Sequence, residues 1–268
     1  MMEKRMTADY KNWVPKGMVV GFFVVFGIFL LLFIVFGCTS VIEPGVLKTV
    51  FFWAFLVGTL VFCDLSFWML HLHQVFSYKG KRQLSRQVIE AVSKYVSIPD
   101  GGVGLDVGCG SGALTIACAK CNPKASMIGL DRWGKEYASY NKALCESNAK
   151  AEGVSNVSFV QGNAVKLDYP DETFDVVTSN YVYHNIPVKD RQALLLETLR
   201  TLKKGGVFAL HDIMTVHRYG DMEAFAASLR RSGYSDVRVI DITRDMFKSE
   251  TEAKLLDLAG SRLLVGRK

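Results

Sequence analysis

The chain has 268 residues, of which 50% are hydrophobic, and its formal net charge at pH 7 is +6. This length allows one large domain and an additional segment. The charge excess is modest and no dense basic stripe is present, which argues against a nucleic-acid-binding protein. The hydrophobic residues are instead concentrated near the N-terminus.

Two apolar stretches, residues 18–37 and 46–72, predict a pair of membrane spans. The first has no charged side chain, and twenty helical residues rise about 30 Å, the thickness of a bilayer's hydrocarbon core. The second contains Asp64, so we expect this residue near an interface or the segment to be re-entrant. A cleaved secretory signal is the alternative for the first stretch, but no small-residue cleavage pattern follows it.

Basic residues flank the two stretches on one side only. Lys16 precedes the first and Lys79 follows the second, each with other basic residues nearby, whereas the connecting residues 38–45 contain none. The positive-inside rule therefore predicts a hairpin with both termini and the following domain in the cytoplasm. We expect residues 1–77 to form the membrane hairpin and residues 78–268 a soluble domain.

Beyond the hairpin, short apolar runs alternate with helical stretches, which is typical of an α/β domain with a mainly parallel sheet. Strands are predicted over residues 103–107, 126–130, 157–160, 174–178 and 207–210. Helices are predicted over residues 113–120, 135–152 and 189–203, the last two ended by Gly153 and Gly205. Residues 236–242 and 262–265 predict two more strands, which can pair as an antiparallel edge.

The stretch VGLDVGCGSGALT, residues 103–115, joins the first predicted strand to three evenly spaced glycines, Gly108, Gly110 and Gly112. In a doubly wound sheet such a strand leads into a tight turn, and ligands bind beside the carboxyl ends of the strands. A glycine-rich loop alone also fits a nicotinamide or flavin protein. Asp106 argues against a pyrophosphate at this loop and favours a cationic ligand such as S-adenosylmethionine.

Two further strand ends present groups suited to the same ligand. Asp131 ends the second predicted strand, where a carboxylate can accept hydrogen bonds from both ribose hydroxyls, as it also does in NAD proteins. Asn163 and Ala164 follow the third strand, and a side-chain amide there can bond the adenine amino group. Three consecutive strand ends thus offer ligand-binding groups.

The motifs LDVGCGSGALT, GLDRW, VQGNA, FDVVTSNYVYHNI and LRTLKKGGVFALHD resemble those of class I S-adenosylmethionine-dependent methyltransferases, in the small-molecule group with the ubiquinone and menaquinone C-methyltransferases. The resemblance runs from about residue 79 to the C-terminus. It implies a Rossmann-like sheet of seven strands, mostly parallel with an antiparallel last strand. Family members often have aspartate where Asn163 stands, and the membrane hairpin is not part of the common pattern. The resemblance implies cofactor contacts by Asp106, Gly108, Gly110, Gly112, Asp131, Arg132, Asn163, Ala164 and Asn180.

Candidate catalytic residues follow the fourth and fifth predicted strands. Methyl transfer needs an acceptor held in line with an activated methyl group and, for an oxygen or nitrogen acceptor, a base. His184 can be that base near neutral pH, or it can brace the turn. Tyr183 can contact the substrate or pack, and Asp212 lies on the same expected rim, with Tyr181 and His211 beside it.

Two other motifs have structural interpretations. The chain has six cysteines, which fit a reducing compartment, and the CxxC pair Cys118 and Cys121 lies in a predicted helix without a second pair of ligands. His71 and His73 are too close in sequence to share one helix face. We therefore expect no metal ion in this protein.

The sequence thus predicts a membrane-anchored enzyme that transfers a methyl group from S-adenosylmethionine to a small, hydrophobic or lipid-associated acceptor at the cytoplasmic face. The alternative is a non-catalytic module that binds or senses S-adenosylmethionine and whose hairpin engages a membrane partner. A third interpretation, an NAD-linked dehydrogenase, requires nicotinamide binding. The sequence leaves open the acceptor atom and the oligomeric state.

Overall fold

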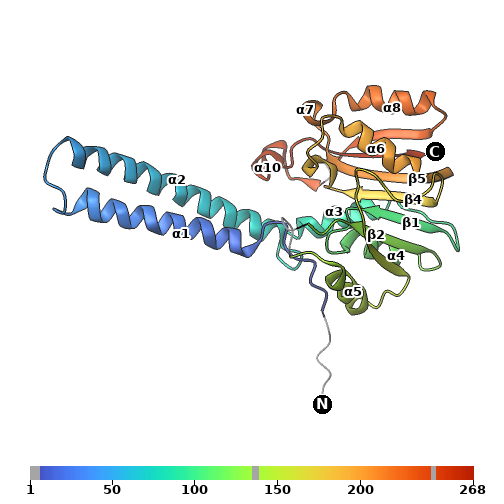
Figure 1. Ribbon diagram of the computed structural model, residues 1–268, viewed down its shortest axis with the longest axis horizontal. Helices are drawn as coiled ribbons and strands as arrows, with labels where there is room; N and C mark the ends of the chain where they lie inside the picture. The colour runs from blue at the N-terminus through green and yellow to red at the C-terminus, as the bar shows by residue number, and fades with distance from the viewer. Residues whose placement is uncertain (1–6, 135–138, 243–245) are drawn as a thin grey trace, which may run out of the picture. The chain divides into compact units, whose positions relative to one another are not determined.

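The computed structural model describes residues 7–134, 139–242 and 246–268. These residues form two compact units. One comprises residues 11–85 and contains a long helical hairpin, and the other comprises residues 7–10 and 86–268 and is an α/β domain (Figure 1). The short segment 7–10 therefore belongs to the α/β domain, although the hairpin follows it directly in the chain.

The hairpin consists of α1 (Lys16–Leu32), continued by the π-helical turn η1 (Phe33–Cys38), and α2 (Val46–Phe76). Both helices are long and apolar enough to cross a membrane, a test of length and composition that an N-terminal signal sequence also passes. Only 6% of each apolar window is buried, unlike the core helix of a soluble protein. Phenylalanine rings join the two helices, among them Phe29 and Phe62, whose centroids are 5.1 Å apart.

Helix α2 continues through Asp64 without a break, so the described chain has no re-entrant turn there. Phe62 and Phe67, on either side of Asp64, pair with Phe29 and Phe23 of α1. Asp64 is therefore level with the middle of α1, and its side chain is exposed. This position differs from the expected one near the end of a span, where an ionised carboxylate is less costly than at mid-depth.

The α/β domain is built on one seven-stranded sheet with the order β3-β2-β1-β4-β5-β7-β6. Only β7 runs antiparallel to its neighbours. The predicted fold class, a mostly parallel sheet with an antiparallel last strand, is therefore confirmed. The strands are β1 (Val103–Val107), β2 (Ser126–Asp131), β3 (Val157–Gln161), β4 (Phe174–Asn180), β5 (Leu202–Ile213), β6 (Ser235–Asp241) and β7 (Ser261–Arg267).

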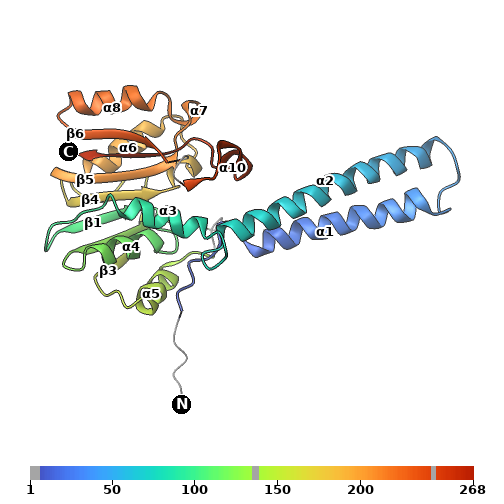
Figure 2. The same cartoon turned by 180° about the vertical axis from the view of Figure 1, so that it is seen from behind.

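The last two strands pair antiparallel at one edge of the sheet, as predicted. β7 is inserted between β5 and β6, and β3 and β6 form the two edges (Figure 2). The reason is visible in the side chains, because Leu263, Leu264 and Val265 bury both faces of β7. A strand that is apolar on both faces belongs inside a sheet, whereas β6 alternates exposed Asp236 and Arg238 with buried Val237.

Two predicted helix boundaries differ from the structure. The helix expected from residue 135 begins at Lys142, because the Asn141 side chain caps it by accepting a 2.8 Å hydrogen bond from the Leu144 N–H; residues 135–138 lie outside the described chain. Gly205 does not end a helix but lies within β5, with a φ of +77°. The helices are α3 (Leu84–Ser93), α4 (Ala113–Cys121), α5 (Lys142–Ala151), α6 (Arg191–Arg200), α7 (Val216–Tyr219), α8 (Met222–Arg231) and α10 (Glu250–Leu255), with a 3-10 turn η3 (Tyr183–Asn185).

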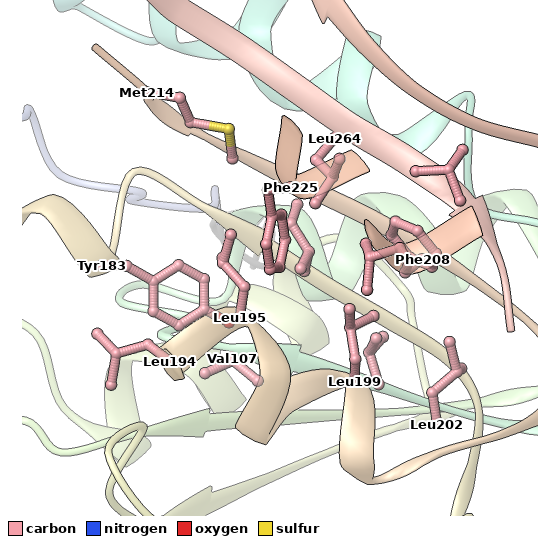
Figure 3. Packing of buried hydrophobic residues seen from close by; sticks show 14 of the residues in the cluster. Val107, Tyr183, Leu194, Leu195, Leu199, Leu202, Phe208, Met214, Phe225 and Leu264 are labelled. Carbon is pink, nitrogen blue, oxygen red and sulfur yellow. The ribbon is translucent and has the colours of Figure 1, made fainter. Parts of the chain in front are cut away.

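The main core joins α6 and α8 to the sheet (Figure 3). Leu195 and Leu199, four residues apart on α6, share one helix face and are fully buried with Phe208 of β5 and Leu264 of β7. Phe225 of α8 completes the group. Full burial of such a side chain stabilises the fold by roughly 1.5–3 kcal/mol. This packing fixes the position of β5, whose end carries candidate catalytic residues.

Candidate active site

The register of the sheet brings the strand ends together. Val107 of β1 pairs with Leu130 of β2 on one side and Ser179 of β4 on the other, and Asn180 pairs with His211 of β5. The carboxyl ends of these four parallel strands therefore meet at one edge of the sheet. The predicted cofactor and catalytic residues follow these ends, which is where open α/β sheets bind ligands.

The loop after β1 is fixed to the end of β2 by its main chain. The N–H groups of Gly108 and Cys109 donate to the Leu130 carbonyl at 2.7 and 3.0 Å. The Gly110 N–H donates to the Asp131 carboxylate at 2.8 Å. Sequence reasoning placed Gly110 and Asp131 in one site, and the structure joins them directly.

Three glycines give this loop its shape, because all have positive φ: +76° at Gly108, +55° at Gly110 and +81° at Gly112. A Cβ on Gly108 would come within 2.3 Å of Val182, so this glycine also allows two segments to approach closely. A Cβ on Gly110 would meet nothing within 4 Å. The loop thus leaves open space above Gly110, which a bound ligand can fill.

Asp131 is half-buried, and both carboxylate oxygens accept main-chain hydrogen bonds. One bonds to Gly110, and the other accepts from the Trp133 N–H at 2.8 Å. The Trp133 indole N–H in turn donates to the Gly110 carbonyl at 3.0 Å. Because a carboxylate has about four acceptor sites, Asp131 retains capacity for ribose hydroxyls. Arg132 is exposed, and its carbonyl accepts from Gln161.

Asp106 lies behind the loop, with only 1% of its surface exposed. Its carboxylate accepts a 2.6 Å hydrogen bond from the Thr115 hydroxyl. Burial raises the pKa of Asp106 to about 7; Asp131 adds to the rise and Thr115 opposes it. A positive charge nearby favours the ionised form. Asp106 is therefore suited to a cationic ligand.

The remaining predicted cofactor residues lie at the ends of β3 and β4. Asn163 is exposed, and its side-chain oxygen accepts from the Val165 N–H at 2.9 Å, while Ala164 is half-buried. The Asn180 side-chain oxygen lies 2.5 Å from the His211 Nδ1. The sheet therefore places both asparagines at the ligand edge, with their side-chain oxygens already engaged.

His184 and Asp212 form a hydrogen-bonded pair, with His184 Nδ1 2.5 Å from Asp212 Oδ1. Asp212 is fully buried and also accepts from Tyr219 Oη at 2.8 Å, the Ile213 N–H at 2.7 Å and the His184 N–H at 3.0 Å. Burial raises the pKa of Asp212, but the bonds and charge of His184 outweigh this and lower it. An ionised carboxylate only accepts, so Nδ1 of His184 carries the hydrogen and Nε2 is unprotonated in the neutral ring.

Tyr183 does not lie on the rim where the sequence placed it. Its side chain is fully buried, and its hydroxyl bonds to the Thr198 hydroxyl at 2.7 Å. Desolvation raises the pKa of this phenol. Tyr183 begins η3 and packs against α6, so we assign it a packing role instead of a catalytic one.

Half-buried Tyr181 and fully buried His211 form a second group beside the pair. Their ring centroids are 4.3 Å apart, and the Tyr181 hydroxyl bonds to Ser261 of β7 at 2.7 Å. Burial lowers the pKa of His211 to about 3, so the ring is neutral. Its Nε2 has no hydrogen-bond partner in the part of the chain that the structure describes. A neutral, enclosed ring is a poor general base compared with His184.

Several residues of the site carried no sequence signal. Tyr219 reaches Asp212 from α7, and Arg191 of α6 donates to the carbonyls of Tyr183, His184, Ile186 and Arg218. No local motif marks either residue. Only Thr115 was within reach of prediction, because it is one turn into the helix that follows the glycines. Within the described residues, no three His, Cys, Asp or Glu side chains form a metal site.

A model of the methyltransferase domain family matches residues 98–251, more than half of the chain. The chain therefore belongs to the methyltransferase domain family, within the S-adenosylmethionine-dependent methyltransferases of class I. It is 30% identical over 148 residues to the demethylmenaquinone methyltransferase of Geobacillus stearothermophilus, which covers 55% of this chain and 58% of the relative. The enzyme of the same name from Bacillus subtilis is 31% identical over 133 residues, 49% of this chain and 54% of the relative.

The chain spans about half the length of the curated relatives that it matches. Among solved structures, the cyclase SpnF is similar with a TM-score of 0.54 and 20% identity, covering 72% of this chain and 85% of SpnF. Geranyl diphosphate methyltransferase is similar with a TM-score of 0.51 and 12% identity, covering 67% and 76%. These structural likenesses support the fold, which alone does not define the chemistry.

Proposed function

We propose that this protein transfers a methyl group from S-adenosylmethionine to a small, hydrophobic or lipid-associated acceptor, and that its hairpin anchors it in a membrane. Two relatives are named as demethylmenaquinone methyltransferases, which supports a hydrophobic, quinone-like acceptor. The two apolar helices, whose side chains are largely exposed, support a membrane anchor. An enzyme held at a bilayer meets an acceptor that is dissolved there.

The cofactor supplies a methyl group already activated by its sulfonium. In the proposed site, the Asp131 carboxylate would accept hydrogen bonds from the ribose hydroxyls, the loop from Gly108 to Gly112 would hold the amino-acid portion, and Asp106 would balance the positive charge of the cofactor. Arg132, Asn163, Ala164 and Asn180 complete the expected cofactor contacts. The open space above Gly110 supports this assignment.

His184 is the proposed general base. The observation that carries this role is its bond to buried, ionised Asp212, which fixes the ring and leaves Nε2 free of a hydrogen. The acceptor's acidic O–H, N–H or C–H would give its proton to Nε2 as the acceptor atom bonds to the methyl carbon and the methyl–sulfur bond breaks, which releases S-adenosylhomocysteine. Asp212 stabilises the resulting imidazolium without taking the proton itself.

The test is methyl transfer from labelled S-adenosylmethionine into extracted membrane lipid and into water-soluble acceptors. We expect label in the lipid fraction with the wild type, and a loss of roughly 10²–10⁴ in turnover for His184→Ala at near-normal cofactor affinity. Asn185→Ala, an exposed neighbour, is the matched control. Transfer only to soluble acceptors would remove the lipid assignment, and no transfer at all would favour the sensing module.

The proposed topology places residues 38–45 outside and the α/β domain in the cytoplasm. The chain offers its own probes, because Cys38 and Cys121 are both exposed, one beside the connecting loop and the other in α4. A membrane-impermeant maleimide added to intact cells should label Cys38 and spare Cys121, and Cys38→Ser should abolish the signal. Labelling of Cys121 in intact cells would reverse the orientation.

A further inference from the structure

The segment before the hairpin packs on the α/β domain. Ala8 and Tyr10 are 9% and 6% exposed, although neither belongs to a helix or strand. We call residues 7–10 the N-terminal strap. Six residues lie between Asp9 and Lys16, where α1 begins, so the strap is the part of the domain that leads directly into the hairpin.

The Asn148 side chain binds the main chain of the strap. Asn148 of α5 is 1% exposed; its Oδ1 accepts from the Asp9 N–H at 2.7 Å, and its Nδ2 donates to the Asp9 carbonyl at 3.0 Å. The two bonds pair both main-chain groups of Asp9 with one amide. This matches the way in which neighbouring strands pair, so Asn148 binds the strap through the main chain of Asp9.

The same amide also holds the glycine-rich loop. The Asn148 Nδ2 donates to the Ser111 carbonyl at 3.0 Å, and Ser111 lies between Gly110 and Gly112. One buried side chain thus joins the strap to the backbone of the loop that faces the cofactor. Loss of the amide leaves the main-chain groups of Asp9 and the carbonyl of buried Ser111 without this partner, which is costly for the buried carbonyl.

We propose that Asn148 is a positioning residue for S-adenosylmethionine: it fixes the glycine-rich loop through Ser111 and the N-terminal strap through Asp9, so that cofactor affinity depends on the segment that enters the hairpin. The loop owes its form to three positive-φ glycines, which are the positions with most backbone freedom in the absence of an external tie. This inference concerns cofactor binding and depends neither on the acceptor nor on His184.

The first test compares, in the full chain, Asn148 of α5 with Asn141, the residue that caps this helix. Asn148→Ala should weaken S-adenosylmethionine binding, measured by calorimetry, about tenfold. Asn141→Ala removes the cap of α5 and should lower thermal stability, but it leaves the bonds of Asn148 to Ser111 and the strap intact. Its affinity for S-adenosylmethionine should therefore stay within about twofold of the wild type. Equal affinity losses in both variants, or none in Asn148→Ala, would overturn the proposal.

The second test changes the strap and leaves α5 intact. Asp9→Pro removes the N–H that donates to the Asn148 Oδ1 and should weaken cofactor binding severalfold in the same calorimetric measurement. The double variant Asn148→Ala with Asp9→Pro should bind no more weakly than Asn148→Ala, because both changes break one link. Additive losses in the double variant would show that the strap acts independently of Asn148, and unchanged affinity in Asp9→Pro would show that the strap does not affect cofactor binding.

Discussion

The candidate site at the carboxyl ends of the strands has two halves, which are formed by different kinds of groups. At the ends of β1 and β2, the site consists mainly of backbone: glycines with positive φ angles, the Gly108 N–H bonded to the Leu130 carbonyl, and the Gly110 N–H bonded to the Asp131 carboxylate. At the ends of β4 and β5, it consists of buried titratable side chains joined to one another, with Asp212 at the centre. We call the first the cofactor half and the second the acceptor half. The cofactor half depends on backbone conformations that few residues adopt, and the acceptor half depends on pairings between residues distant in sequence.

Asp212→Asn should have the largest effect, and only on the acceptor half. An amide in place of the carboxylate can donate to Nδ1 and so favours the tautomer with a hydrogen on Nε2 of His184. Turnover should fall by at least about 10², while calorimetry shows cofactor affinity close to normal. Tyr219→Phe, which removes one donor but keeps the carboxylate, is the control with a smaller loss. Equal loss of cofactor affinity and turnover would erase the distinction between the halves.

Gly108→Ala should lower the free energy of unfolding by roughly 3 kcal/mol, the sum of the strain of a left-handed alanine and the collision of its Cβ with Val182. Gly110→Ala adds left-handed strain of about 1–2 kcal/mol, but its Cβ meets no atom, so it should be the less destabilised of the two variants. Thermal unfolding of the two variants measures the difference. Similar unfolding temperatures would mean that close packing at Gly108 is unimportant.

Asp106 should make the stability of the fold depend on pH. Its pKa rises from 3.8 to about 7 on folding, so between these values the folded state keeps a proton that the unfolded state has lost. Stability therefore decreases as pH rises through that window. Asp106→Asn cannot titrate, and its unfolding temperature relative to wild type should rise from pH 4 to pH 7. A pH-independent difference in unfolding temperature would show that Asp106 does not titrate between pH 4 and pH 7 in the folded protein.

The cofactor half was readable in the sequence because its signals are local. Three glycines two residues apart after an apolar strand, and an acid at the end of the next strand, define the loop and its carboxylate within thirty residues. The acceptor half was readable only in part. His184 and Asp212 were both candidates, but the 28 residues between them conceal their bond, and nothing near Tyr183 indicates that its hydroxyl faces Thr198.

Local patterns by themselves determined the alternation of strands and helices, the apolar hairpin and the glycine-rich loop, because each depends on residues close together in the chain. Tertiary packing decided the rest: β7 inside the sheet, Asp64 level with the middle of α1, Tyr183 in the core, and the strap joined to the loop by Asn148. Each of these follows from which distant surfaces become buried together, and burial is a property of the folded chain as a whole.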